Sequence, residues 1–96
     1  MRESTVEGYL TTRVKALGGE VRKLAWVNRR HAPDRMVLLP RSQFYFLAEI
    51  KRPGKRASGG QGREITRLRR AGLRVYVLDS FAAVDAVLAQ EGPQWW

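Results

Sequence analysis

The sequence predicts an α/β fold in which helices cover both faces of a central sheet. Three observations lead to this prediction. Apolar residues recur at helical spacing near both ends of the chain, short apolar runs lie between them, and glycine or proline separates the segments. The chain has 96 residues, which is enough for one core, so we expect a single domain over residues 1–96.

The first half of the chain predicts one helix and three strands. Valine and leucine repeat at helical spacing over residues 4–17, and a glycine pair ends the pattern. A strand at 21–27 follows, and then a basic loop. Apolar strands at 35–39 and 44–50 flank the four-residue turn 40–43, so they should form a hairpin. Both faces of these strands are largely apolar, which indicates a sheet covered on both sides.

The second half predicts a helix, a strand and a final helix. A glycine-rich basic loop at 52–60 precedes a helix over residues 61–71, whose arginines should face outward. A strand at 73–78 and a helix over residues 81–90 follow, the last capped by Asp79 or Ser80.

Hairpin pairing brings charged residues together. If residues 40–43 form the turn, paired residue numbers sum to 83, and Asp34 lies opposite Glu49 on the same face, with Cβ atoms about 4.5–5.5 Å apart. Lys51 is two residues further along and projects from that face. Two carboxylates at this separation can share a divalent cation.

A purely structural alternative exists for each of these residues. Asp34 can form an Asx-type turn after Pro33, while Glu49 and Lys51 can be solvated charges at the end of an edge strand. The apolar run over residues 44–48 favours the metal site, because it places Glu49 at the end of a buried strand.

The charge distribution indicates a nucleic-acid partner. The net charge is +9 with 14 arginines, and residues 22–74 hold 15 basic residues but only three acidic ones. Arginine suits phosphate oxygens because its planar fork donates two parallel hydrogen bonds. A GC-rich genome is the alternative source of arginine. The absence of cysteine excludes disulfides and thiolate zinc sites, and the single histidine excludes a histidine-rich one. Because no apolar run is long enough to span a membrane and no signal peptide is evident, we expect a soluble, cytoplasmic protein.

These motifs resemble the VRR-Nuc domains of the PD-(D/E)xK nuclease superfamily. The matching features, in chain order, are Glu7, Pro33-Asp34, Glu49-Ile50-Lys51, Gln61, Leu68-Arg69-Arg70-Ala71-Gly72 and Val75-Tyr76-Val77. The resemblance covers residues 4–80. It departs from the family at His31-Ala32, where a glycine is expected, and at the glycine-rich segment 57–60. It implies a restriction-endonuclease-like α-β-β-β-α-β core with a C-terminal helix and a central mixed sheet flanked by helices.

The resemblance also implies an Mg²⁺- or Mn²⁺-dependent DNA endonuclease. Asp34, Glu49 and the Ile50 carbonyl would hold the metal, with Glu7 as a further ligand or a residue behind the ligands. Lys51 would orient or deprotonate the attacking water, and Gln61 would help to place it. Glu7 can instead complete a capping box with Ser4, and Gln61 one with Ser58.

The basic residues near this site are the candidate DNA contacts: Arg29, Arg30, Arg52, Lys55, Arg56, Arg63 and Arg67. The family suggests a homodimer that cuts branched DNA such as four-way junctions, in a bacterial or phage-infected cell. Two alternatives stay open: a basic nucleic-acid-binding module without catalysis, and an RNA-cleaving enzyme with the same site. Trp95 and Trp96 can stack on bases, contact a partner chain or pack on the protein itself.

Overall fold

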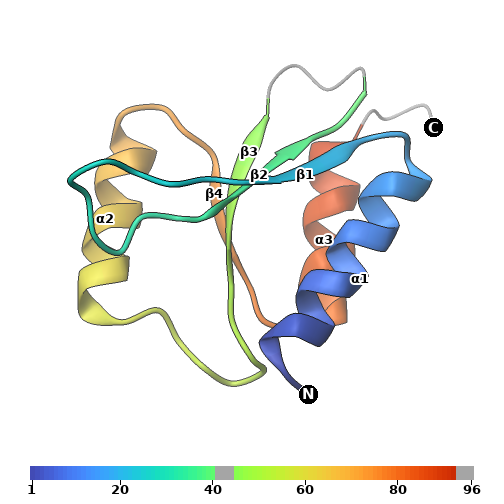
Figure 1. Cartoon of the computed structure of the whole chain (residues 1–96), viewed down its shortest axis with the longest axis horizontal. Coiled ribbons are helices and arrows are strands. Elements are labelled where there is room, and N and C mark those ends of the chain that lie inside the picture. The colour runs from blue at the N-terminus through green and yellow to red at the C-terminus, as the bar shows by residue number, and fades with distance from the viewer. Residues whose placement is uncertain (41–44, 93–96) are drawn as a thin grey trace.

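A computed structural model describes residues 1–40 and 45–92 of the chain (Figure 1). Its elements follow the predicted order: α1 (Glu3–Ala16), β1 (Glu20–Lys23), β2 (Arg35–Leu38), β3 (Phe46–Ile50), α2 (Gly59–Arg70), β4 (Val75–Leu78) and α3 (Phe81–Glu91). Most of the predicted turn at 40–43, and the residues Trp95 and Trp96, lie outside the described ranges.

The four strands form one mixed sheet in the order β1-β2-β3-β4. β1, β2 and β3 pair antiparallel, and β4 runs parallel to β3 after the α2 crossover. Arg35 pairs with Ala48, Met36 with Leu47 and Val37 with Phe46, so paired residue numbers sum to 83 as predicted. The register confirms the hairpin arithmetic.

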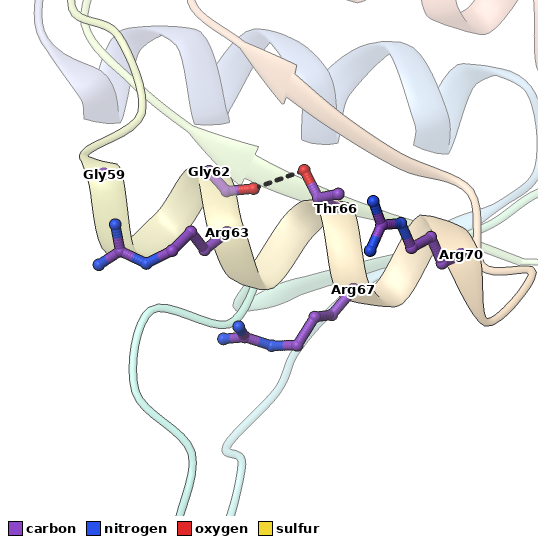
Figure 2. A pocket seen from close by; sticks show the side chains of 6 residues that line it. All are labelled: Gly59, Gly62, Arg63, Thr66, Arg67 and Arg70. Carbon is purple, nitrogen blue, oxygen red and sulfur yellow. Dashed lines mark hydrogen bonds between the residues drawn. The ribbon is translucent and has the colours of Figure 1, made fainter.

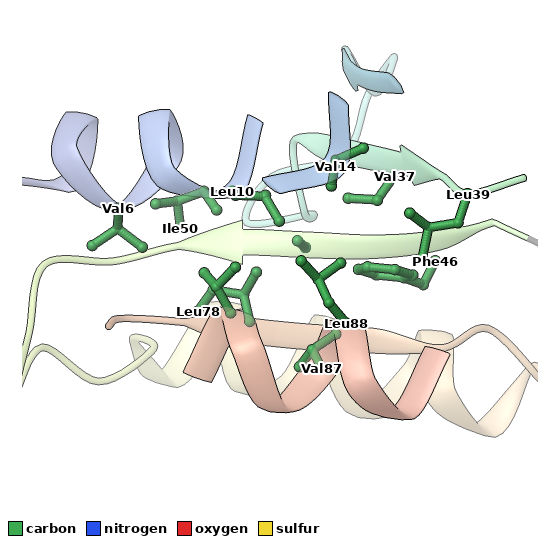
Figure 3. Packing of buried hydrophobic residues seen from close by; sticks show 12 residues of the cluster. Val6, Leu10, Val14, Val37, Leu39, Phe46, Ile50, Leu78, Val87 and Leu88 are labelled. Carbon is green, nitrogen blue, oxygen red and sulfur yellow. The ribbon is translucent and has the colours of Figure 1, made fainter. Parts of the chain in front are cut away.

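Helices cover both faces of the sheet (Figure 1). α1 and α3 contact each other on one face, where their apolar side chains meet Val37, Phe46 and Ile50 (Figure 3). α2 covers the other face, where Ile65 packs with Leu47 and further apolar residues of the sheet. The alternation of side chains along β3 supplies both cores, since neighbouring residues of a strand point to opposite faces.

The ends of the helices and of β1 differ in detail from the prediction. α1 begins at Glu3 with Arg2 at the N-cap position and no side-chain capping bond, so the Ser4 capping box does not form. Ser80 caps α3, one of the two predicted residues. β1 ends at Lys23, four residues earlier than predicted, because the chain then leaves the sheet and Trp26 packs toward the α2 face.

No helix within residues 1–40 and 45–92 has both the length and the hydropathy needed to span a membrane.

Candidate active site

Asp34 and Glu49 lie at one end of the β2–β3 pair. Glu49 is the fourth residue of β3, and Asp34 directly precedes β2, one step beyond the Arg35–Ala48 pair. The backbone fixes this corner firmly. Leu24 donates its N–H to the Asp34 carbonyl at 2.9 Å, and the Trp26 indole N–H donates to the carbonyl of buried Pro33 at 2.7 Å. Sequence reasoning had not assigned this anchoring role to Trp26.

Glu49 is a buried carboxylate with little compensation. The residue is only 9% exposed, and Lys51 Nζ lies 3.9 Å from its Oε2 atom. In the part of the chain that the structure describes, it accepts no hydrogen bond from another residue. Burial, and then the charges of Asp34 and Glu3, raise the pKa of Glu49 to about 7, although Lys51 and Arg35 oppose the shift. The positive charges of Lys51 and Arg35 therefore do not offset the cost of burying this carboxylate.

Arg35 is the main residue of this site that sequence reasoning missed. Its guanidinium donates to Glu7 Oε1 from Nε at 3.0 Å and pairs with the same oxygen through Nη2 at 2.9 Å. Its Nη1 lies 3.0 Å from Asp34 Oδ1 and donates to the Asp34 carbonyl at 3.2 Å. Glu7 therefore reaches the sheet, where its contact is Arg35.

Gln61 completes the capping box that had been its alternative role. Ser58 Oγ accepts from the Gln61 N–H at 3.2 Å, and Gln61 Oε1 accepts from the Ser58 N–H at 3.1 Å. This bond fixes Gln61 at the first turn of α2.

The basic loop at residues 28–33 docks against α2 through Glu64. Glu64 is 1% exposed and pairs with Arg29 from the loop and with Arg67 at 2.9 Å from its own helix. Glu64 and Arg67 are three residues apart on α2, a spacing that favours an ion pair on a helix surface, but here the carboxylate is buried. Hydrogen bonds from Arg29, and then from Arg67, lower the pKa of Glu64 despite its burial. Both arginines keep about half of their side chains exposed.

The two departures from the family pattern meet in space. His31 adopts a left-handed backbone with φ 64°, a conformation that favours glycine. The family pattern has a glycine in this two-residue segment, His31-Ala32. The His31 ring lies against Gly60, so that a Cβ atom added at Gly60 would come within 2.6 Å of His31 Cδ2. The glycine at position 60 therefore makes room for the histidine at position 31.

Three arginines line a shallow hollow of about 520 Å³ on the outer face of α2 (Figure 2). Arg63, Arg67 and Arg70 project from it, and Gly59, Gly62 and Thr66 complete its floor. Because the glycines carry no side chain, a ligand can approach the helix backbone closely there. The other candidate contacts, Arg30, Arg52, Lys55 and Arg56, are exposed in the loops that adjoin the site.

The donor set at the site suits a hard divalent cation. No group of three or more acidic, histidine or cysteine side chains is placed to hold a metal within the described residues. Mg²⁺, however, is commonly held by one or two protein carboxylates, with waters and substrate phosphates completing its six oxygen ligands. Asp34, the undercompensated Glu49 and the backbone carbonyl of Ile50 match that limited requirement.

Two known proteins are similar to this chain. The "Putative nuclease p44" of Acyrthosiphon pisum secondary endosymbiont phage 1 is 40% identical over 80 residues, which cover 83% of this chain and 85% of the relative. A solved VRR_NUC domain structure superimposes with a TM-score of 0.80 and 38% identity, over 95% of this chain and 97% of that one. No family model matches the sequence.

The raised pKa of Glu49 predicts how stability depends on pH. In metal-free protein the unfolded chain loses this proton near pH 4.5, whereas the folded state keeps it until about pH 7. The free energy of unfolding therefore contains a contribution that falls as pH rises through this window. Glu49→Gln lacks this contribution. We expect the variant to gain stability relative to the parent by about 2–3 kcal/mol between pH 4.5 and pH 8, since one pKa unit is worth about 1.4 kcal/mol.

Urea unfolding of both proteins in a chelator measures this difference. Carboxylates that do not interact with Glu49 contribute alike in both proteins, so their effects cancel. A stability gap that stays constant from pH 4.5 to pH 8 contradicts the prediction.

Proposed function

The chain belongs to the VRR-Nuc nuclease family, and on that premise we propose that it is a metal-dependent endonuclease that hydrolyses phosphodiester bonds in DNA. The observation that supports this most is the buried Glu49 carboxylate beside Asp34 within a strongly basic chain. A carboxylate that is costly to ionise is poorly explained by a role in folding alone. A cation bound at this position offsets that cost.

In this proposal Asp34, Glu49 and the Ile50 carbonyl hold Mg²⁺ or Mn²⁺. Such an ion supplies charge that polarises the scissile phosphate and makes a nearby water more acidic. The chain's own residues orient the reactants. Lys51, whose side chain is 13% exposed, points its ammonium toward the same space and offsets phosphate charge while orienting the water. The capping bond of Gln61 uses Oε1, which leaves its amide N–H groups to place that water.

The basic loops and the arginine hollow are the proposed DNA surface. Arg29, Arg30, Arg52, Lys55 and Arg56 adjoin the site, while Arg63 and Arg67 lie on α2. Arg63 and Arg70 are seven residues apart, which is about 10.5 Å along a helix. Phosphates of one strand advance by about 3.4 Å along the duplex axis, so Arg63, Arg67 and Arg70 together can span roughly three of them.

The proposed substrate is branched DNA such as a four-way junction, cut by a homodimer. A chain of 96 residues has a small footprint, and two symmetric copies bring two sites to two strands. The phage relative is consistent with a role in a bacterial or phage-infected cell. Sedimentation of the protein, free and on junction DNA, measures the assembly. A non-catalytic nucleic-acid-binding module and an RNA-cleaving enzyme are the alternatives, and cleavage assays on DNA and RNA separate them.

Substitutions at the site should separate cleavage from binding. Glu49→Gln keeps the side-chain volume and removes the charge that holds the metal, and Lys51→Ala removes the ammonium beside it. Each should lower the cleavage rate in Mg²⁺ or Mn²⁺ by at least about 100-fold. Without metal, Glu49→Gln should bind DNA at least as tightly as the parent, because a negative charge near the phosphate is gone.

Single-turnover cleavage and binding titrations measure these two effects. Arg63→Ala is the control, since it should weaken binding slightly and leave the cleavage step intact. If Glu49→Gln cuts DNA at the parental rate, the active site is wrong and the binding-module alternative takes its place.

The salt dependence of binding tests the α2 surface. Each lost phosphate contact lowers the slope of log affinity against log salt by about 0.9 for duplex DNA, so Arg63→Ala/Arg70→Ala should lower it by about 2. Arg13→Ala/Lys15→Ala is the charge-matched control, because it removes two cations from the last turn of α1 on the opposite face of the sheet. Equal slopes for the two double variants would show that net charge, and not this hollow, attracts DNA.

A further inference from the structure

The backbone of Asp34 is fixed, but its position in the chain does not fix its side chain. Asp34 precedes β2, so the strand ladder does not constrain its side chain, which is 53% exposed. Without a partner for its side chain, such a carboxylate would sample several rotamers, and each extra rotamer would lower the fraction of molecules that are ready to bind a cation.

Arg35 supplies the missing constraint. Its side chain is only 12% exposed, and it pairs with Glu7 on one side and with Asp34 Oδ1 at 3.0 Å on the other. Arg35 lies opposite Ala48, whose side chain belongs to the core under α1, so its guanidinium starts from the α1 face of the sheet. The guanidinium thus links helix α1 to the Asp34 corner.

The planar fork of arginine makes this link possible. One edge, Nε and Nη2, engages Glu7 Oε1, which leaves Nη1 to engage Asp34. A lysine ammonium carries the same charge but cannot present two separated edges at fixed geometry. Two of the four contacts of the guanidinium are hydrogen bonds, to Glu7 Oε1 and to the Asp34 carbonyl, and both are charge-assisted because the guanidinium is ionised.

We propose that Arg35 is a positioning residue that holds the Asp34 carboxylate ready for the metal, and that Glu7 acts through Arg35 as its anchor instead of as a metal ligand. This inference rests on the proposed metal-dependent function. Arg35 stays bound to Glu7 when the metal site is filled.

Calorimetric titration with Mn²⁺, without DNA, tests the arrangement. Arg35→Lys keeps the charge and removes the fork, so its affinity for Mn²⁺ should fall about tenfold or more, as for other residues that orient metal ligands. Glu7→Gln should weaken binding less, because its amide oxygen still accepts from Arg35. The double variant should bind no more weakly than Arg35→Lys alone, since both changes break the same link.

Arg13→Lys is the matched control. Arg13 also pairs with a carboxylate, Asp85, but between α1 and α3, away from the site, so its substitution should leave Mn²⁺ affinity unchanged. Additive losses in the Glu7 and Arg35 variants would overturn the proposal by making Glu7 an independent ligand. If Arg35→Lys binds Mn²⁺ with an affinity within twofold of the parent, Arg35 does not orient Asp34. If the variant binds Mn²⁺ more tightly, Arg35 competes with the metal. Either result would overturn the proposal.

A measurement on the unaltered protein keeps the test independent of variant folding. The Nε–H proton of Arg35 should exchange slowly with water by NMR, both without metal and at saturating Mg²⁺, because Glu7 still accepts it. Fast exchange at saturating Mg²⁺ would overturn the proposal, since Glu7 would then have left Arg35. Failure of the proposed function looks different: in that case Glu49→Gln binds Mn²⁺ as well as the parent does.

Discussion

The antiparallel pairing of β2 with β3 determines which side chains meet at the candidate site. With paired numbers summing to 83, Arg35 faces Ala48 on the α1 side, and the next step along the ladder brings Asp34 beside Glu49. A slip by one residue would turn every side chain of one strand to the other face. It would remove Phe46 and Ile50 from the core that α1 and α3 form, so the packing that fixes the fold also fixes the site.

Most of the buried or partly buried glutamates form ion pairs that hold the fold together, whereas Glu49 does not. Glu7, Glu64 and Glu91 each pair with arginines, and these pairs join elements that are distant in the sequence. Arg74 pairs with Glu91, and Arg69 donates to the Val75 carbonyl, so part of the arginine content holds the fold together. Glu49 differs from those glutamates, because burial is its dominant influence and Lys51 lies as far as 3.9 Å away. This contrast distinguishes the candidate metal site from the structural ion pairs.

Sequence patterns predicted the order of elements, the register and the two covered faces, because each follows from local periodicity and from one turn length. They missed Arg35 and the buried Glu64, since both depend on contacts between segments 28 or more residues apart. They also offered capping boxes with Ser4 and with Ser58 as the alternative roles of Glu7 and Gln61. The box with Ser4 does not form, while the box with Ser58 does. Capping motifs of similar sequence differ in outcome because the chain before each helix decides where that helix begins.

The proposed function requires a divalent cation at the Asp34–Glu49 end of the sheet. Anomalous diffraction from crystals soaked in Mn²⁺ tests it most directly, because the signal locates the ion without reference to activity. We expect a peak within about 2.0–2.6 Å of oxygens from Asp34, Glu49 and the Ile50 carbonyl, with the Arg35–Glu7 contact retained. Fully occupied Mn²⁺ elsewhere, with none between these two carboxylates, would contradict it.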